Sequence, residues 1–331
     1  MKEYKVGILG ATGAVGQEMI KVLAERNFPV SELRPLASSR SAGKPIEFKG
    51  EKCEIKEAKE GAFDNLDIVL GAAENDVSIA MTPYIKSAGA VYIDNSSAYR
   101  LDKDVPLVVP EVNKEDIKLH KGIIANPNCV TIIAATALAP ILKLANIKTL
   151  VASSYQAVSG AGAAGLAELE KQAQDYPSGK ELEVKAFKQQ ILFNLIPKIG
   201  GIDNKGYSSE EMKLQNEGRK IMHLPDLKVC CTCVRVPVMR SHAISMQFVL
   251  DKHLSVDEIK DAITNGEGVK LYDDAQNEIY PMPLVTSDQD LVYVGRIRED
   301  LINENGIALW CCGDQIRKGA ATNAIQIAEL L

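Results

Sequence analysis

The first part of the chain alternates between short apolar runs and segments in which apolar residues recur at helical spacing. Residues 4–9 form an apolar run rich in strand-forming side chains, and apolar residues then recur at helical spacing from Val15 to Leu23. Further strands are expected at 33–40, 66–73 and 90–97, with a crossover helix at 76–89. This alternation predicts an α/β fold with a doubly wound parallel sheet.

From residue 129 onward, long β-rich segments alternate with helices, which is typical of a mixed α+β domain. The β-rich segments are 148–160 and 228–251, and helical spacing occurs at 164–176, 208–222 and 255–264. Pro and Gly interrupt 177–206, so an irregular path is expected there. The segment 314–331 has a helical pattern and is expected to pack on the first domain. We therefore expect a first domain of residues 1–128 completed by 314–331, and a second domain of residues 129–313.

Length and charge narrow the class of protein. A chain of 331 residues suits two domains, and its net charge of −6 argues against nucleic acid as a partner. No apolar stretch approaches the roughly 18 residues that a membrane span needs, and the N-terminal residues lack the pattern of a signal peptide. The seven cysteines are an odd number without a disulfide pattern, which predicts reduced thiols and a cytoplasmic location.

Gly10, Gly13 and Gly16 follow the first predicted strand directly and open an amphipathic helix. Such a loop lets the backbone approach a pyrophosphate, which the helix N-terminus also attracts, so the pattern indicates a Rossmann-type dinucleotide site. The alternative is a purely structural turn between strand and helix. The second strand ends in residues 38–41 with no carboxylate for ribose hydroxyls, and Arg40 beside Ser41 favours the 2′-phosphate of NADP. A solvated Arg40 is the alternative.

Cys129 is the cysteine whose position suggests chemistry. If a helix begins at or just after Asn128, the thiol lies in the first turn, where the helix dipole and unbonded N–H groups stabilise a thiolate. Pro140 would then kink or end that helix. The alternative is a small buried hydrophobic residue. The other cysteines, at 53, 230, 231, 233, 311 and 312, fit that alternative better, and the Cys230–Cys233 spacing does not indicate a metal site.

A nucleophilic thiol needs an acid or base partner, and the chain has four histidines. His120 and His253 lie in charged stretches, and His223 ends a polar helix. His242 lies between two predicted strands of the second domain, seven residues after Arg235, which makes it the candidate. A packed or solvated histidine remains the alternative.

Several motifs occur in a fixed order along nearly the whole chain. They are Gly10/Gly13/Gly16, Asn126–Cys129, Tyr155–Gly162, Glu210–Lys213, Cys233–Pro237 and His242, followed by 294–298 and 313–324. With this series the chain resembles the aspartate-β-semialdehyde dehydrogenase family. The resemblance implies reduction of β-aspartyl phosphate by NADPH to aspartate semialdehyde and phosphate, on the route to lysine, methionine and threonine.

The resemblance also implies roles for individual residues. Cys129 would form a thioester, His242 would act as general acid/base, and Gln156 would orient substrate and thiol. Arg235 would hold the substrate α-carboxylate and Glu210 its α-amino group, with Glu211 as an alternative to Glu210. Substrate and phosphate would contact Arg100, Asn128, Glu210, Lys213 and Arg235; the cofactor would contact Gly10, Thr12, Gly13, Ala14, Val15, Gly16, Arg40, Ser41, Ser159, Gly160 and Gln315. Judged without the family, Glu210 and Lys213 are a surface ion pair at i, i+3.

The chain departs from the family at two places, and three rival interpretations are weighed against it. Val130 stands where the family often has serine after the nucleophile, and the carboxylates of Glu74 and Asp76 at a strand end leave NAD as an alternative cofactor. N-acetyl-γ-glutamyl-phosphate reductase usually has Tyr-Pro-Thr after its cysteine, unlike residues 130–132, and glyceraldehyde-3-phosphate dehydrogenase usually has Cys-Thr-Thr-Asn. A non-catalytic dinucleotide-binding paralogue would not need the whole catalytic set. The family also implies a homodimer or a dimer of dimers, formed mostly by the second domain.

Overall fold

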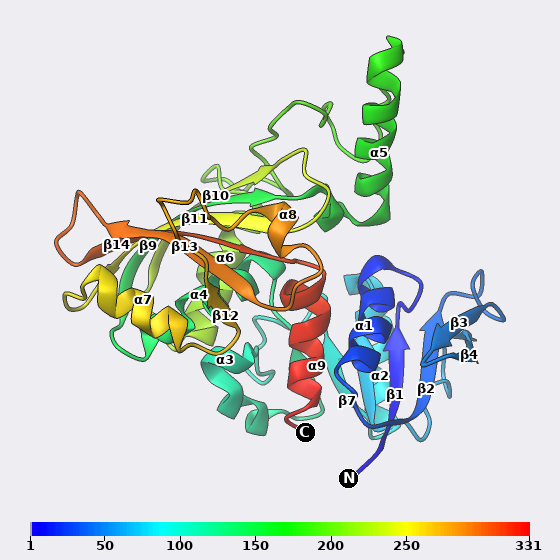
Figure 1. Cartoon of the computed structure of the whole chain (residues 1–331). Helices are drawn as coiled ribbons and strands as arrows, with labels where there is room; N and C mark the ends of the chain where they lie inside the picture. Colours follow the sequence, from blue (N-terminus) through cyan, green and yellow to red (C-terminus); the bar gives the residue numbers. More distant parts are fainter. Residues whose placement is uncertain (1) are drawn as a thin grey trace. The chain divides into compact units, whose positions relative to one another are not determined.

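The computed structural model describes residues 2–331, which form two compact units (Figure 1). The first unit contains the chain up to Asn128 together with Ala320–Leu331, and the second contains Cys129–Gly319. Both units have mixed α/β structure, as the sequence pattern predicts. No helix within residues 2–331 combines the length and the apolar character needed to cross a membrane.

The first unit is built on six parallel strands in the order β5-β2-β1-β6-β7-β8. The strands are β1 (Tyr4–Leu9), β2 (Val30–Ala37), β5 (Lys56–Glu57), β6 (Ile68–Gly71), β7 (Val91–Asp94) and β8 (Ile123–Ala125). The connecting elements are α1 (Ala14–Glu25), the hairpin β3 (Pro45–Phe48) and β4 (Glu51–Glu54), α2 (Asn75–Ser87), α3 (Pro110–Asn113) and a 3-10 helix (Lys114–Leu119). The strand order reverses between β1 and β6, and ligands of such sheets bind beyond the strand ends at this point.

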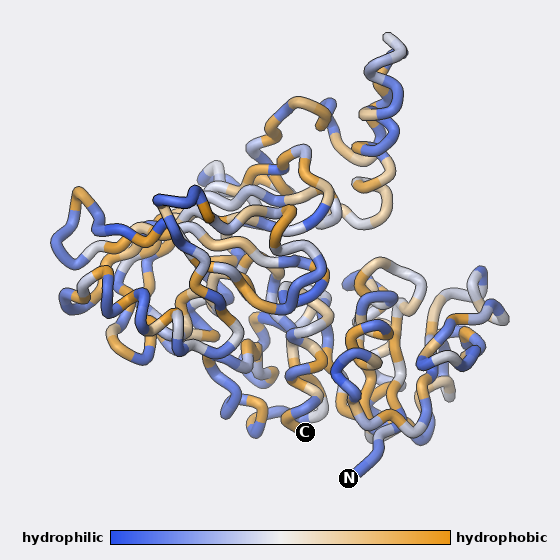
Figure 2. The backbone as a smooth tube through the Cα atoms, in the orientation of Figure 1, coloured by the Kyte–Doolittle hydropathy of each residue, from blue (hydrophilic) through white to orange (hydrophobic). Residues whose placement is uncertain are grey.

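Burial of one helix face fixes α1 on this sheet. Met19, Val22 and Leu23 recur at helical spacing and are fully buried against strand residues such as Ile8. The last helix, α9 (Asn323–Ala328), adds its own buried side chains, among them Ile325, to the same core. Figure 2 shows orange, apolar stretches of the tube alternating with blue, polar ones in this unit.

The second unit has a mixed six-stranded sheet in the order β10-β9-β11-β14-β13-β12. The strands are β9 (Ile147–Gln156), β10 (Lys228–Arg235), β11 (His242–Leu250), β12 (Val269–Leu271), β13 (Val292–Glu299) and β14 (Gly306–Gly313). Its helices are α4 (Cys129–Leu142), α5 (Gly162–Asp175), α6 (Ser209–Ile221), α7 (Val256–Thr264) and α8 (Pro283–Thr286), with 3-10 turns at Val158–Ala161 and Tyr176–Ser178. In Figure 1, α5 projects away from the sheet of its own unit.

One face of this sheet is covered, and the other is open except where α8 packs against β14. Along β9, Leu150 and Ala152 are buried whereas Val151 between them is 51% exposed, because successive side chains point to opposite faces. Helices α4 and α6 pack on the covered face against β10, β11 and β14. Every residue of α4 from Val130 to Ile141 is buried, which explains why its sequence is apolar apart from Thr131 and Thr136.

Most predicted elements are confirmed, with differences that have physical reasons. The strand expected at 33–40 runs from Val30 to Ala37, and the β-rich segment 228–251 is two strands separated by a turn. Pro140 lies in the last turn of α4, which continues to Leu142. The helical segment expected at 314–331 is a π-helical turn, Arg317–Thr322, followed by α9, and the hairpin β3–β4 was not expected because its residues are largely polar.

Candidate active site

The glycine loop of the first unit lies at the point where its strand order reverses. Gly10 has φ +88°, and a Cβ added there would lie 2.7 Å from the carbonyl oxygen of Ala72, beyond the end of β6. Gly13 is the N-cap of α1 and offers no side chain to the first-turn N–H groups. Gly16 packs against the backbone of Gly10 and Ala11 with no room for a side chain. This loop therefore fits a pyrophosphate, which needs close backbone approach and unbonded N–H donors.

The turn after β2 lies beside this loop. The N–H groups of Gly10 and Ala11 both donate to the carbonyl oxygen of Leu36, at 2.9 and 3.1 Å. Arg40 and the half-buried Ser41 lie three and four residues after Ala37, the last residue of β2, and Arg40 is exposed. A cation and a hydroxyl thus occupy the position at which a carboxylate would bind ribose hydroxyls in an NAD-specific site.

Arg100 is buried at the carboxyl ends of β7 and β8. Its guanidinium donates to the carbonyl oxygens of Asn95 at 2.6 Å and Asn126 at 3.1 Å. Asn126 in turn accepts a hydrogen bond from Asn323 at 2.6 Å. This framework fixes the backbone just before Asn128, which is buried and is bonded covalently to Cys129.

In the second unit, strand directions bring several predicted site residues to one end of the sheet. Gln156 ends β9 and pairs with Arg235, which ends the parallel strand β10. His242 begins the antiparallel strand β11 and pairs with Gly313, the last residue of β14. β9, β10 and β14 run in one direction and β11 runs in the opposite direction. The ends of the first three strands and the start of β11 therefore lie together, so these four residues lie at the same end of the sheet.

Cys129 is the first residue of α4 and is partly exposed. The prediction that the thiol lies in a first helical turn is therefore confirmed. A Cβ added to Gly319 would lie 3.0 Å from the Cβ of Cys129, so the backbone at Gly319 packs closely against Cys129. None of the seven cysteines, all within the described residues, forms a disulfide.

His242 is fully buried, and the N–H of Ala157 donates to its Nδ1 at 3.1 Å. Burial, and then the positive charge of Arg235, lower the pKa of His242 to about 3, so the ring is neutral at physiological pH. Because Nδ1 accepts, the proton of the neutral ring is on Nε2. Within residues 2–331 Nε2 has no hydrogen-bond partner, so a buried donor is left for a ligand.

Arg235 is buried and donates from Nη1 to the carbonyl oxygen of Ala157 at 2.6 Å. Burial lowers the pKa of Arg235, while Cys129 and Glu210 nearby favour its charged form. A Cβ added to Gly160 would lie 2.7 Å from Nη1 of Arg235 and 3.3 Å from Nε2 of His242. Gly160 thus leaves open the space next to both groups.

The two adjacent glutamates of α6 have different surroundings. Glu210 accepts from Lys213 at 2.9 Å and from Gln156 at 3.4 Å, and only 8% of it is exposed. The pair with Lys213 is therefore not a solvated surface pair. Glu211 accepts instead from the N–H groups of Ser208 at 2.6 Å and Cys233 at 3.1 Å. Glu210 is the carboxylate that reaches Gln156.

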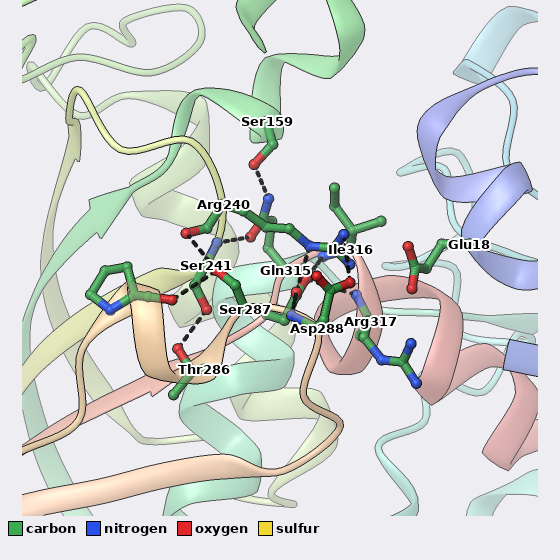
Figure 3. A network of polar contacts seen from close by, with 12 residues as sticks. Glu18, Ser159, Arg240, Ser241, Thr286, Ser287, Asp288, Gln315, Ile316 and Arg317 are labelled. Carbon is green, nitrogen blue, oxygen red and sulfur yellow. Dashed lines mark hydrogen bonds and ion pairs between the residues drawn. The ribbon is translucent and has the colours of Figure 1, made fainter. Parts of the chain in front are cut away.

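Gln315 joins two segments of the site. Its Nε2 donates to the hydroxyl of Ser159, and its Oε1 accepts from the N–H of Ser241 at 2.8 Å (Figure 3). Sequence reasoning selected Ser159 and Gln315 but missed Ser241, Arg240 and Gly319. Arg240 could not be singled out because its partner, Asp314, is 74 residues away in the chain.

Comparison with known proteins agrees with this fold and site. Residues 5–120 match the family model described as semialdehyde dehydrogenase, NAD binding domain, and residues 138–318 match semialdehyde dehydrogenase, dimerisation domain. The fold, the site and these matches define an oxidoreductase that acts on an aldehyde with a nicotinamide dinucleotide.

Individual relatives narrow the class further. The aspartate-semialdehyde dehydrogenase of Aquifex aeolicus is 49% identical over 332 residues, covering 99% of this chain and 98% of the relative. The crystal structure of aspartate semialdehyde dehydrogenase II complexed with ASA from Vibrio cholerae has a TM-score of 0.97 and 42% identity, covering 100% and 98% of the two chains. The enzyme with NADP from Candida albicans has a TM-score of 0.77 and 27% identity, covering 100% and 98%. The chain belongs to the aspartate-semialdehyde dehydrogenase family.

Proposed function

We propose that this chain catalyses the NADPH-dependent reduction of β-aspartyl phosphate to aspartate semialdehyde and phosphate, on the route to lysine, methionine and threonine. The observation that carries the proposal is that the buried guanidinium of Arg235 and the neutral imidazole of His242 lie at the same end of the second sheet. The relative from Vibrio cholerae is described as complexed with ASA, which supports the same substrate here. No comparison favours the acetylglutamyl or non-catalytic alternatives.

Cys129 is the proposed nucleophile. Its Sγ would attack the acyl carbon of β-aspartyl phosphate, the bond from that carbon to the phosphate oxygen would break, and phosphate would leave with the electron pair. The first-turn N–H groups of α4 favour the thiolate form and, with Gln156, can stabilise the negative charge on the carbonyl oxygen. A bound NADPH would supply a hydride to the carbonyl carbon of the resulting thioester.

His242 would serve the reacting oxygen as hydrogen-bond donor and acid/base group. Its Nε2 carries the proton in the neutral ring and has no partner within the described residues. The proton would assist the oxygen as negative charge develops there, and it would return to Nε2 when the carbonyl re-forms and Cys129 leaves as a thiolate.

Substrate recognition is assigned to charged groups around Gln156. The planar guanidinium of Arg235 suits the α-carboxylate, and Glu210 suits the α-amino group. Glu211 is less suited because two backbone N–H groups already occupy its carboxylate. We assign the substrate phosphate to Lys213, Arg100 and Asn128, as the family motifs imply.

The dinucleotide is assigned to the loop Gly10–Gly16, with Thr12, Gly13, Ala14 and Val15 at the pyrophosphate. Three features support NADP: the missing carboxylate after β2, the exposed Arg40 with Ser41, and the Candida albicans relative with NADP. Ser159, Gly160 and Gln315 of the second unit complete the cofactor set. The seven cysteines without a disulfide support a cytoplasmic location.

We assign self-association to the open face of the second sheet, as a homodimer. This face carries the exposed Val151 and the rings of Tyr155 and Trp310, whose centroids are 5.4 Å apart. A pocket of about 400 Å³, lined in part by Trp310, Tyr280 and Arg296, offers room for a side chain of the second copy. The match of residues 138–318 to a dimerisation domain supports this assignment.

The test is absorbance at 340 nm with aspartate semialdehyde and NADP⁺, with and without phosphate. We expect phosphate-dependent formation of NADPH, with a smaller rate when NAD⁺ replaces NADP⁺. Cys129→Ser should lower kcat by at least about 10³-fold because the hydroxyl is a much weaker nucleophile. Cys53→Ser, in the hairpin of the first unit, should retain the wild-type rate. A wild-type enzyme that is inactive under all these conditions, or a fully active Cys129→Ser, would refute the proposal.

A further inference from the structure

Asp314 is a fully buried carboxylate that directly follows β14. Its Oδ1 accepts from the N–H groups of Ile316 at 2.9 Å and Arg317 at 3.1 Å. Its Oδ2 accepts from the N–H of Asp288 at 2.7 Å and from Nε of Arg240 at 2.6 Å. Four donors therefore converge on one side chain to which the reaction proposed above gives no role.

The loop that Asp314 holds carries Gln315, whose side chain bonds two segments next to His242. Gln315 bonds the backbone N–H of Ser241, the residue just before His242. It also bonds the hydroxyl of Ser159, two residues after Ala157, which donates to the imidazole. Figure 3 shows Gln315 between Ser159 and Ser241, with contacts to both. A shift of this loop would be felt by His242 from two directions.

Ser241 has a conformation that needs such support. Its φ is +76°, a region that residues other than glycine rarely adopt, and it persists only where neighbours hold it. Its N–H is bonded to Gln315, and its hydroxyl contacts Thr286 at 2.6 Å. Asp288, whose N–H donates to Asp314, also has a positive φ, of +62°. The direction in which the chain enters β11, and with it the aim of His242, depends on these contacts.

The far end of the same loop lies against the nucleophile. The N–H of Gly319 donates to the backbone carbonyl of Asp314 at 2.9 Å, and the Gly319 backbone closes on Cys129. Arg240 links the carboxylate to a further charge, since its Nη1 lies 3.0 Å from Oδ1 of Asp288. The loop Asp314–Gly319 thus contacts the surroundings of both reacting groups.

We propose that Asp314, paired with Arg240, is a positioning residue that sets the orientation of His242 through Gln315 and Ser241. The inference rests on the proposed function, because it gives His242 its task. An asparagine at position 314 would keep the shape but replace one acceptor oxygen by an NH₂ group. That group would then face two donors, and the loop would shift.

The experiment is a double-mutant cycle of Asp314→Asn with His242→Gln. We expect Asp314→Asn to lower kcat by roughly 100-fold with a much smaller change in KM, because a catalytic group is misplaced while substrate binding is retained. In the His242→Gln background the same substitution should change kcat by less than about threefold. Equal losses in both backgrounds would show a purely structural anchor and overturn the proposal.

Asp300→Asn is the matched control. Asp300 accepts from the N–H of Ile302 and the side chains of Gln247 and Asn303 at the opposite end of the β13–β14 hairpin. The Asp300→Asn substitution should lower thermal stability and leave kcat near the wild-type value. If Asp314→Asn does not fold, Arg240→Lys takes its place in the cycle, because lysine keeps the charge but cannot bond both Asp314 and Asp288 with the same geometry.

A second readout does not depend on activity. Nitrogen NMR of the four imidazoles should show a single neutral tautomer for His242 of the wild type, with the proton on Nε2. Asp314→Asn should produce a mixture of tautomers, whereas Asp300→Asn should not. If the wild type does not act on aspartate semialdehyde, the proposed function fails while this spectrum still decides the role of Asp314. An unchanged tautomer in a folded Asp314→Asn protein would overturn the inference.

Discussion

Single residues of the site are defined by what lies around them more than by their type. His242 is one of four histidines, and its character comes from full burial, from the Ala157 N–H at Nδ1 and from the nearby Arg235. Together these hold the ring neutral with its proton on Nε2. A cavity that kept the ring charged would need a carboxylate next to Nε2, and the described residues provide none there.

The lowered pKa of His242 makes the stability of the protein depend on pH. The folded pKa is about 3, whereas an unfolded histidine has a pKa of about 6.5. The unfolded chain therefore binds more protons between these values, so stability present above pH 6.5 is lost as the pH falls toward 3. When the pH is lowered from 7 to 4.5, the free energy of unfolding should fall by about 2–3 kcal/mol more for the wild type than for His242→Gln.

Urea denaturation at the two pH values measures this difference. His253→Gln is the control, because it removes an exposed histidine and leaves the buried His242 in place. Parallel losses for the wild type and His242→Gln would mean that His242 is not buried in its neutral form.

The sequence was sufficient to select Cys129 and His242 but not to explain how they are held. A thiol at the expected start of an apolar helix and a histidine between two strands are local patterns. The choice between Glu210 and Glu211 was not local, because it depends on the strand N–H of Cys233 that occupies Glu211. Arg240 and Asp314 form a pair only after two distant strand ends have come together.

At the scale of elements, α6 and α7 begin with the same motif in different surroundings. In each, a serine N-cap accepts from the N3 backbone and a glutamate at N3 accepts from the N-cap backbone. The capping box formed by Ser208 and Glu211 is buried, and Glu211 also accepts a hydrogen bond from the Cys233 N–H of the edge strand β10. In the capping box formed by Ser255 and Glu258, the glutamate is exposed.

Removal of these two glutamates should therefore have unequal effects. Glu211→Ala leaves two buried N–H groups without an acceptor and should lower the free energy of unfolding by about 2–4 kcal/mol. Glu258→Ala should cause a clearly smaller loss, because water replaces the carboxylate. Chemical denaturation of both variants tests this, and losses of similar size would contradict the role of Glu211 at the sheet edge.

Elements with a strong apolar period could be predicted from the sequence, and short polar ones could not. Tyr4–Leu9 and Ala14–Glu25 bury a run or a stripe of apolar side chains, which their patterns show. Glu51–Glu54 buries none of its residues fully and exists because it pairs with Pro45–Phe48. Such a strand has no pattern of its own to read.

At the scale of the whole molecule, the order of strands in the second sheet was beyond sequence reasoning. β9 lies between β10 and β11 in the sheet. In the sequence, however, β9 ends at Gln156 and β10 begins 72 residues later, at Lys228. Local periodicity does not encode which distant segments pair. The resulting sheet has a face that α8 covers in part, where Thr286 contacts Cys312 of β14, and the proposed dimer uses the open remainder of this face.

Val151→Asp tests that use of the open face. Val151 is 51% exposed at the middle of β9, and a carboxylate there would be desolvated if a second copy covered it. Light scattering should show the wild type as a dimer and Val151→Asp as a monomer at micromolar concentration. Ile79→Asp, which changes a 53% exposed side chain on α2 of the first unit, should remain dimeric. A dimeric Val151→Asp would exclude this face.

The contribution of α9 to the first core has a consequence for biosynthesis of the chain. Ile325 and Ile327 pack with Met19 and Val22, which the ribosome produces some three hundred residues earlier. The second unit is complete in sequence at Gly319, whereas the first waits for Ala320–Leu331. The part that is translated first is therefore the last to have its full core, and nascent chains must keep that apolar surface from aggregating until Ala320–Leu331 have been synthesised.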